Sequence, residues 1–410
     1  MKKSIKQFFK KLGPGLITGA SDDDPSGIAT YSQAGAKLGL ATLWTAWITF
    51  PLMFSIQEMS ARIAIVTSKG LISNIKEHYH SSIVYFTLCC CIPAIILNIA
   101  ADLAAMGAAT HLIIPSVSSI FFSFFYSCII LLMLVFCNYK SISKILKYFC
   151  LVLFLYFIVP FLVKQNWQEV VSYTFVPTVQ LNKDYISLLV AILGTTISPY
   201  LFFWQATMES EEKYQVKSKK LILKQMYLDV GLGMFISNLV MYFIILTTGT
   251  ILFKNGITHI DTVEQAAKAL EPLAGKLCYL LFSIGIVGTG LLAIPVFSSC
   301  ISYLITSSFN YKEGLNKKFH QAKLFYFIIS ISILVGLLID LLKISPIRVL
   351  IFTATFYGIS APPIIFIIML ICNNKNIMGK YINGRWANLF GSITFILMLL
   401  ASMLLLYFQF

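Results

Sequence analysis

The feature that most constrains the fold is an apolar stretch near the N-terminus that is interrupted by three consecutive carboxylates and a proline. It reads Gly13-Pro-Gly-Leu-Ile-Thr-Gly-Ala-Ser-Asp-Asp-Asp-Pro-Ser-Gly27 and continues as far as Gly35. Hydrocarbon cannot hydrogen-bond the backbone groups that a broken helix frees, so such a break is tolerated only where protein or a water-filled cavity surrounds it. Acidic residues at membrane depth mark an ion or substrate path. The stretch therefore predicts a broken helix that lines a cation site.

The rest of the chain has the composition of a polytopic membrane protein. Of its 410 residues, 58% are hydrophobic and 12% are charged, and the mean hydropathy is +0.82. A helical span takes about 20 apolar residues, so the chain holds about eleven spans. We expect an all-α fold and one transmembrane transport domain over residues 1–410, since no linker sets off a soluble domain. The expected spans cover residues 13–38, 41–67, 83–113, 118–137, 146–163, 185–208, 229–253, 273–306, 324–342, 346–371 and 387–408.

The basic residues predict the orientation of these spans. With the N-terminus inside, 22 Lys and Arg fall in the inner segments and 8 in the outer ones. This asymmetry is the positive-inside rule, and it accounts for the net charge of +14 without a nucleic-acid partner. The basic N-terminus leads into a polar break rather than a cleavable apolar core, so we expect it to be retained on the cytoplasmic side. The predicted location is the inner membrane of a bacterium.

A second break lies in the sixth expected span, in Gly194-Thr-Thr-Ile-Ser-Pro-Tyr200. Residues 24 and 198 are both helix-capping types that are followed by proline, which is how a helix starts rather than how it continues. The predicted half-helices are residues 13–20 and 25–38, then 185–196 and 199–210. Matching breaks in two halves indicate a transporter built from inverted repeats, with its site between the breaks. We expect the repeats to cover residues 13–163 and 185–371, with an extra helix at 387–408.

The residues at the two breaks suit a hard divalent cation, which takes oxygen ligands. Asp24 offers a carboxylate, and the half-helices free backbone carbonyls near Ala20 and Thr195 at their negative ends. Ser198 and Thr195 add hydroxyls. Asp24 also has the simpler role of capping the second half-helix, and the two roles are compatible because a carboxylate has several lone pairs.

Other acidic residues leave alternatives open. Asp22 and Asp23 either attract cations in a vestibule or form a solvated flank, because three adjacent carboxylates do not all stay ionised cheaply in a poorly hydrated place. Asp102, deep in the third span, either relays protons and lines the aqueous path or makes a structural hydrogen bond. Glu58 and Arg62 are spaced as an i,i+4 pair. The run 209–212 is interpreted as a solvated face at the cytoplasmic mouth of the sixth span.

Together these residues resemble the natural resistance-associated macrophage protein (NRAMP) family of divalent metal transporters, which has the leucine-transporter fold. The resemblance covers nearly the whole chain and includes Gly13-Pro-Gly15, Asp24-Pro25, Gln57 to Arg62, Asp102-Leu-Ala104 and Gly194 to Pro199. It implies a leucine-transporter-like fold with 5+5 inverted repeats and discontinuous helices 1 and 6.

The chain departs from the family pattern at the expected metal site. The usual Asp-Pro-Gly-Asn reads Asp24-Pro-Ser-Gly27, so Gly27 holds the position of an asparagine ligand. The usual Met-Pro-His with a further histidine reads Ser198-Pro-Tyr200 with Gln205, and Ala105 replaces an acidic residue. Tyr200 and Gln205 are therefore candidates for the ion path. A thioether favours softer metals, whereas an all-oxygen site suits magnesium, calcium and manganese. The pattern is similar to that of the NRAMP-related magnesium transporters.

The sequence thus predicts an importer of Mg²⁺ or Mn²⁺ that works by alternating access, without strict need for protons because the lost histidines titrate near neutral pH. The metal is the transported substrate, and the lipid bilayer surrounds the protein. We expect no cofactor, no enzymatic activity and no obligatory protein partner. Three rivals remain: a proton-coupled Mn²⁺/Fe²⁺ symporter of the ordinary family type, an amino-acid transporter of the same fold, and a membrane receptor or scaffold that transports nothing.

Overall fold

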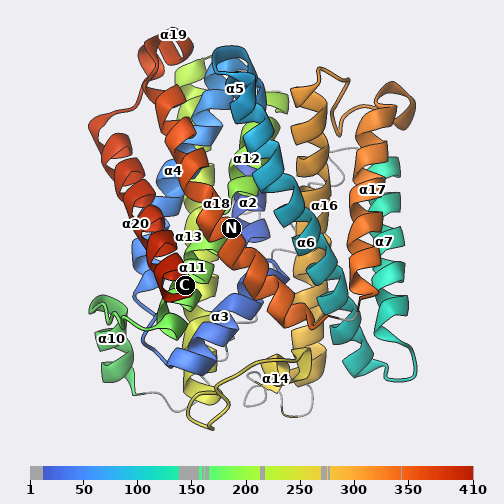
Figure 1. Ribbon diagram of the computed structural model, residues 1–410, viewed down its shortest axis with the longest axis vertical. Coiled ribbons are helices and arrows are strands. Elements are labelled where there is room, and N and C mark those ends of the chain that lie inside the picture. The colour runs from blue at the N-terminus through green and yellow to red at the C-terminus, as the bar shows by residue number, and fades with distance from the viewer. Residues whose placement is uncertain are drawn as a thin grey trace, which may run out of the picture.

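The computed structural model consists of long helices that run side by side, most of them between the same two ends of the molecule (Figure 1). It describes residues 13–137, 157–158, 161, 166–212, 218–268, 275, 278–342 and 344–409. In these ranges the regular structure is entirely helical, as the sequence predicts. The long helices are α4 (Thr45–Thr67), α6 (Ser81–Ile113), α7 (Ser119–Phe136), α13 (Lys219–Ile251), α16 (Cys278–Ser308), α17 (Lys323–Asp340), α18 (Pro346–Asn373) and α20 (Arg385–Gln409).

Two predicted spans are divided into pairs of shorter helices. The first pair is α2 (Pro14–Asp22) and α3 (Pro25–Leu38), and the second is α11 (Lys183–Thr196) and α12 (Pro199–Glu211). Both breaks lie where the capping residue and proline predict them. The remaining short helices are α5 (Leu71–His78), α10 (Trp167–Phe175), α14 (Val263–Ala267), α19 (Lys375–Met378), and the 3₁₀ turns η4 (Phe319–Gln321) and η5 (Gly379–Tyr381).

The two breaks differ in how the second half-helix begins. Asp24 caps α3 with its side chain, since Oδ1 accepts a hydrogen bond from the Gly27 backbone N–H at 2.6 Å. Ser198 occupies the corresponding position of α12, but its hydroxyl donates backward, to the carbonyl of Gly194 or of Thr195, each 2.7 Å away. Proline follows the cap in both, where its missing N–H costs nothing. Only the first break therefore has the side-chain cap that the sequence suggests.

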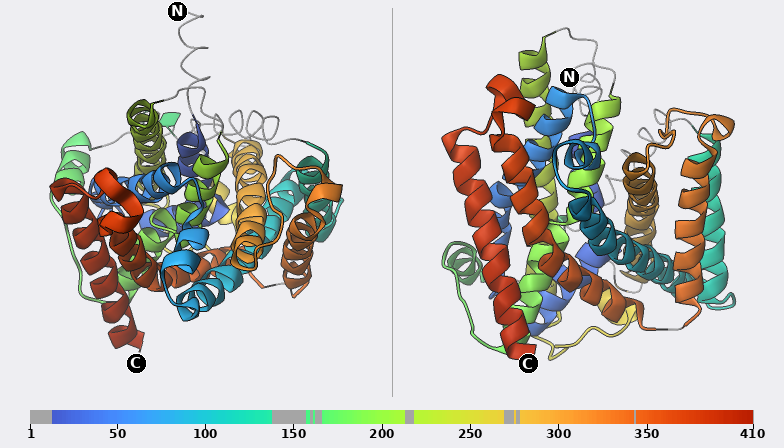
Figure 2. Two further views of the ribbon diagram at one scale, coloured as in Figure 1. Left: turned by 90° about the horizontal axis from the view of Figure 1, so that it is seen from above. Right: turned by 45° about the horizontal axis from the view of Figure 1, so that its top comes forward.

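The broken segments lie inside the bundle and the unbroken helices surround them. In the most apolar 18-residue window of Lys183–Glu211, 89% of residues are buried, against 22% in α7 and 33% in α20. Figure 2 shows α20 and the α7–α17 pair on opposite flanks of the molecule. Large apolar side chains such as Phe121, Phe124 and Phe136 of α7 are exposed. This distribution is that of helices whose outer faces contact lipid.

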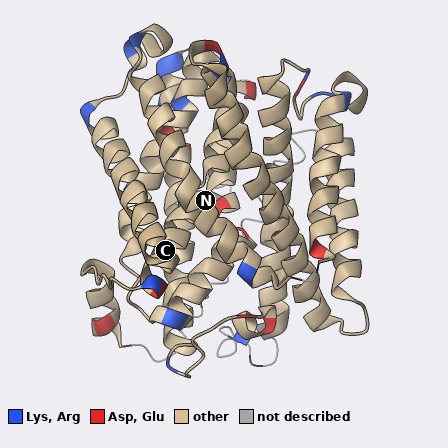
Figure 3. Cartoon of the chain, viewed as in Figure 1, with Lys and Arg blue, Asp and Glu red and all other residues tan. Residues whose placement is uncertain are grey.

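Eight described helical segments are long and apolar enough to cross a membrane. The divided first segment and α4 correspond to two further predicted spans. The expected span at 146–163 falls almost wholly outside the described residues. Figure 3 shows most Lys and Arg near the two ends of the bundle, with few charged residues between them. The described parts of the predicted inner loops share the end with α5 and α19, and those of the outer loops share the end with α10 and α14 (Figure 1).

Close backbone contacts fix the position of α2 against α13. A Cβ on Gly19 would lie 2.3 Å from backbone atoms of Gly233, and one on Gly15 would lie 2.7 Å from the Val230 nitrogen. Gly15 and Gly19 form a small-xxx-small pair, which lets membrane helices approach closely. Asp229 of α13 accepts hydrogen bonds from the N–H groups of Gly13 and Gly15 at 2.8 and 2.7 Å. The first half-helix is thus held at its N-terminus and along one face.

The pair Glu58–Arg62 forms as predicted, with Nε of Arg62 2.8 Å from Oε1 of Glu58. Arg62 also donates to the Tyr381 carbonyl at 2.8 Å and to Oδ1 of Asn383 at 2.6 Å. This arginine therefore ties α4 to the segment that leads into α20.

Candidate functional site

The first break brings three carboxylates into the interior of the protein. Asp22 and Asp23 are fully buried, and Asp24 is 2% exposed. Asp22 is the last residue of α2, Asp23 is its C-cap, and Asp24 starts α3. The last carbonyls of α2, from about Ala20 onward, lack intrahelical partners because the helix ends there. Negative groups of two kinds, carboxylates and carbonyls, therefore converge on one short segment.

The second break lies beside the first. The Tyr200 hydroxyl of α12 donates to the Ser21 carbonyl of α2 at 3.1 Å, a direct hydrogen bond between the two broken segments. Thr195 and Ser198, at the end of α11 and the start of α12, are buried as well. The structure thus brings the predicted ligand residues of both breaks into one buried region. The Tyr200 ring packs against the rings of Phe297 and Tyr357, with centroids 4.6 and 5.5 Å apart.

Gly27 has no side chain to offer and stands where the backbone is crowded. A Cβ on Gly27 would lie 2.8 Å from the Asp22 carbonyl oxygen. Its N–H is already bonded to Asp24. Any larger residue here requires the first break to open, so this glycine contributes to the site through the backbone geometry rather than as a side-chain ligand.

Asp24 receives a second hydrogen bond from a helix distant in sequence. The amide nitrogen of Asn98, on α6, donates to Oδ2 of Asp24 at 2.7 Å. Each carboxylate oxygen of Asp24 therefore has one donor and retains lone pairs for a cation. One turn further along α6 is Asp102, also fully buried. Among the described residues, neither carboxylate oxygen of Asp102 has a hydrogen-bond partner, so the structural role that the sequence left open for it is not formed here.

The neighbouring carboxylates are only partly satisfied. Ser237 of α13 donates to Oδ2 of Asp22 at 2.6 Å. In the described part of the chain, Oδ1 of Asp22 and both oxygens of Asp23 lack a hydrogen-bond partner. Both residues are buried, which rules out the solvated flank for this conformation.

The carboxylates at the first break have no basic partner among the described residues. The ion pairs that the described residues form are Lys37–Asp184, Glu58–Arg62, Lys69–Glu77 and Arg348–Asp261, none of them at the breaks. Burying unpaired carboxylates is costly, and a divalent cation is the kind of group that offsets the cost.

The end of α12 differs from the sequence prediction. The amide nitrogen of Gln205 donates to Oε1 of Glu209 at 2.8 Å, and both residues are buried. The interpretation of 209–212 as a solvated face is therefore wrong for Glu209, because the helix turns this residue inward. Glu211 accepts hydrogen bonds from the Tyr303 hydroxyl at 2.8 Å and from the Asn316 amide at 3.3 Å. These contacts tie the end of α12 to α16 and to the loop that follows it.

That loop carries a further acidic group. Glu313 accepts hydrogen bonds from the hydroxyls of Ser307 and Thr306 at 2.7 Å each. Burial raises the pKa of the Glu313 carboxyl, and these hydrogen bonds oppose the rise. The loop therefore covers this end of the bundle with polar contacts that depend on α16.

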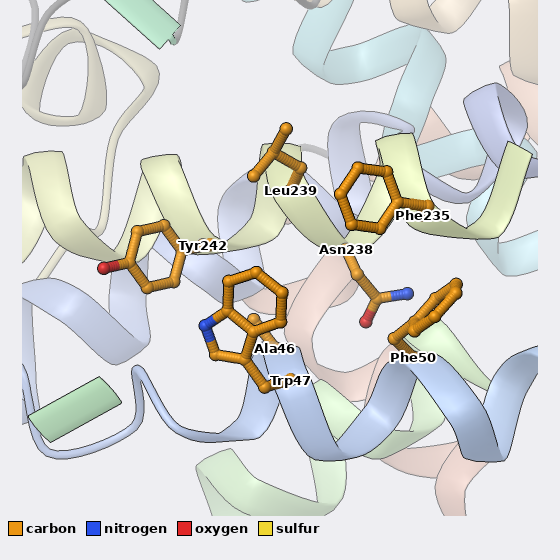
Figure 4. A pocket seen from close by; sticks show the side chains of 7 residues that line it. All are labelled: Ala46, Trp47, Phe50, Phe235, Asn238, Leu239 and Tyr242. Carbon is orange, nitrogen blue, oxygen red and sulfur yellow. The ribbon is translucent and has the colours of Figure 1, made fainter. Parts of the chain in front are cut away.

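The pocket in Figure 4 lies apart from the carboxylates of the first break. It lies between α4 and α13 and is lined by Ala46, Trp47, Phe50, Phe235, Asn238, Leu239 and Tyr242. Its lining carries no acidic group, and Trp47 and Phe235 are well exposed on the outer surface of the bundle. Within the described ranges, no group of three or more His, Cys, Asp or Glu side chains is placed to hold a metal ion. A cation at the breaks would therefore need ligands other than these side chains to complete its shell.

Two residues that the sequence interpretation missed complete the polar surroundings of the breaks. Asn98 could have been identified from the sequence, because it lies four residues before Asp102 and therefore on the same face of an apolar helix. The sequence did not indicate the contact of Ser237, because a lone serine in a membrane helix usually donates a hydrogen bond to its own backbone. Its contact with Asp22 depends on how α13 packs.

Comparisons with known proteins place the chain in a defined family. A sequence model described as natural resistance-associated macrophage protein-like matches residues 15–408. The divalent metal cation transporter MntH of Caldanaerobacter subterraneus subsp. tengcongensis is 25% identical over 98% of this chain and 94% of its own. The solved manganese transporter of Eremococcus coleocola superposes with a TM-score of 0.78 at 16% identity, over 97% of this chain and 86% of that one.

A more distant solved structure shares the architecture. MhsT in complex with L-phenylalanine superposes with a TM-score of 0.61 at 11% identity, over 97% of this chain and 98% of that one. At such identities a likeness shows the fold alone. It confirms the all-α, leucine-transporter-like fold with discontinuous first and sixth helices that the sequence resemblance implies.

Proposed function

The chain belongs to the natural resistance-associated macrophage protein-like family, and on that premise we propose that it transports divalent metal cations across a membrane. The observation that carries the proposal is the buried Asp24 carboxylate between two interrupted helices, surrounded by further carboxylates and by no ion-pairing Lys or Arg among the described residues. The names of the related transporters support the same substrate class.

The proposed ligands come from both breaks. Asp24 is the principal ligand, the Ala20 and Thr195 carbonyls and the Ser198 hydroxyl surround the ion, and water completes its shell. Ser198 donates its proton to a helix carbonyl, which leaves the lone pairs of its oxygen available. Gly27 shapes the break and keeps the site wide.

This ligand set favours a hard cation. Oxygen ligands suit Mg²⁺, Ca²⁺ and Mn²⁺, and the thioether that favours softer metals is absent from position 198. Mg²⁺ sheds water reluctantly, so a site that accepts a partly hydrated ion suits it. We propose Mg²⁺ or Mn²⁺ as the cargo.

The remaining buried polar residues belong to the proposed path of the ion. Asp22 and Asp23 raise the local cation concentration at the first break. Asp102 lines the opposite wall on α6, and Tyr200 closes the space between the breaks. Gln205 and Glu209 lie on α12, toward the end with α5, which is the exit if the basic loops face the cytoplasm.

Transport is proposed to proceed by alternating access, with the repeats at residues 13–163 and 185–371 rocking around the breaks. The charge distribution supports an N-terminus on the inner side, and the bacterial MntH relatives support a plasma membrane. An inside-negative potential then drives uptake by about 2.3 kcal/mol per charge per 100 mV, without a coupled proton.

The test is metal uptake by proteoliposomes under an inside-negative potential. The wild type should accumulate divalent cations, and Asp24→Ala should lose at least about 90% of the rate because the principal ligand is gone. Asp184→Ala removes an exposed carboxylate far from the breaks and should keep the wild-type rate. Equal uptake by Asp24→Ala and wild type would refute the site, and absence of uptake by the wild type is the result expected of a receptor or scaffold.

A proton-coupled Mn²⁺ symporter is the second candidate function. The name of the solved manganese transporter favours its ion. Its proton coupling is favoured by Asp102, a buried carboxylate without a hydrogen-bond partner among the described residues. Acidification of the liposome lumen during metal uptake would support it over uptake driven by potential alone.

A further inference from the structure

Asn98 is a buried amide in the middle of an apolar helix, where a polar side chain is costly unless it is used. It lies in α6, which is unbroken, so the geometry of the half-helices does not require it. Its nitrogen contacts Oδ2 of Asp24 at 2.7 Å. Its carbonyl oxygen has no hydrogen-bond partner among the described residues.

We propose that Asn98 is an ion-selectivity residue of the transport site, holding Asp24 with its nitrogen and offering its carbonyl oxygen to the transported cation or to one of that cation's water molecules. The inference rests on the proposed function and adds to it a ligand from a third element. Nitrogen and oxygen belong to the same small amide, so an oxygen whose nitrogen touches Asp24 lies within reach of a hydrated ion bound there.

The Asn98 amide supplies a side-chain group of a kind that is absent from position 27 of the first break. At Gly27 no side chain is present, and a Cβ there would contact the Asp22 carbonyl. Asn98 brings an amide to the same carboxylate from the opposite wall. A neutral carbonyl oxygen is a ligand that suits a hard cation and adds no further negative charge to a site that already holds several carboxylates.

The surroundings of Asn98 separate this role from a purely structural one. One turn along the same face stands Asp102, whose oxygens also lack partners in the described structure. Asn238 of α13 offers the contrast, since its amide donates to the Met234 carbonyl at 2.8 Å and its oxygen accepts from Thr49 at 2.6 Å. Both ends of the Asn238 amide are therefore satisfied, whereas the oxygen of Asn98, beside the Asp24 carboxylate, has no partner among the described residues.

The experiment compares uptake of Mg²⁺, Mn²⁺ and Cd²⁺ by proteoliposomes containing wild type, Asn98→Leu or Asn98→Met. Leucine removes the amide with little change in volume, and the KM for Mg²⁺ should rise roughly tenfold. Methionine adds a thioether, so uptake of Cd²⁺ relative to Mg²⁺ should be higher in Asn98→Met than in Asn98→Leu. Asn238→Leu and Asn238→Met are the matched controls and should keep the wild-type order of ions.

The uptake measurements either support or overturn the role of Asn98 in ion selectivity. A wild-type ion profile and KM in both Asn98 variants would overturn it, while loss of transport by Asp24→Ala would leave the proposed function standing. Should leucine or methionine prevent folding, as judged by size-exclusion chromatography, Asn98→Ser decides instead. A raised KM for Mg²⁺ with normal protein yield supports the inference, and an unchanged KM overturns it.

Discussion

At the scale of single residues, the first break uses one carboxylate for two tasks. Asp24 satisfies a backbone N–H at the start of α3 and accepts the Asn98 amide, yet it keeps lone pairs on both oxygens. The cap fixes the direction of the carboxylate, and the second donor fixes its rotation. A cation ligand that is already held in place loses little conformational entropy when the ion arrives.

Ser198 is the residue through which ion preference can be changed most simply. Ser198→Met places a thioether at the second break and should raise uptake of Cd²⁺ relative to Mg²⁺. The measurement is competitive uptake into proteoliposomes.

Ser198→Ala is the control for that substitution, since it removes the hydroxyl without adding sulfur. It should lower uptake of every ion without favouring Cd²⁺. The same ion order in Ser198→Met and Ser198→Ala would show that this position does not face the cargo.

At the scale of elements, glycines let α2 and α13 approach closely enough for their backbones to touch. Gly19→Ala would put a Cβ 2.3 Å from the Gly233 backbone, so α2 must shift. The expected destabilisation is about 1–3 kcal/mol, the usual cost of overpacking, visible as a lower unfolding temperature of the purified protein. Gly384→Ala is the matched control because it has no neighbour within 4 Å and its φ is not positive. Equal unfolding temperatures for the two variants would contradict this packing.

Both breaks were predictable because a capping residue followed by proline can only start a helix. The half-helix bounds differ from the prediction by two residues at most. What surrounds the breaks was not predictable. Ser237 and Asp229 reach α2 from α13, more than 200 positions away, and their contacts exist only because glycines bring those helices together. Glu209 was misjudged for a similar reason, since which face of α12 is buried depends on its neighbours rather than on its own sequence.

At the scale of the whole molecule, the arrangement places a buried, carboxylate-rich region at the junction of two broken helices inside a bundle of apolar ones. The outer helices supply the lipid-facing surface, as the exposed phenylalanines of α7 show. The inner ones expose free helix ends only where protein covers them, which is the condition under which interrupted helices are stable in a membrane. The fold thus concentrates the cost of burying carboxylates at one place, and a bound divalent cation would offset it.

The most direct test of the proposed hard-ion site is competitive uptake of Mg²⁺, Mn²⁺ and Ca²⁺ by proteoliposomes of the wild-type protein under an inside-negative potential. A site made of carboxylate, carbonyl and hydroxyl oxygens should carry Mg²⁺, and Mg²⁺ in excess should compete with Mn²⁺. Uptake should increase with the size of the potential because the cargo carries two positive charges. Strong Mn²⁺ uptake that excess Mg²⁺ neither shares nor inhibits would contradict the hard-ion site between the two breaks.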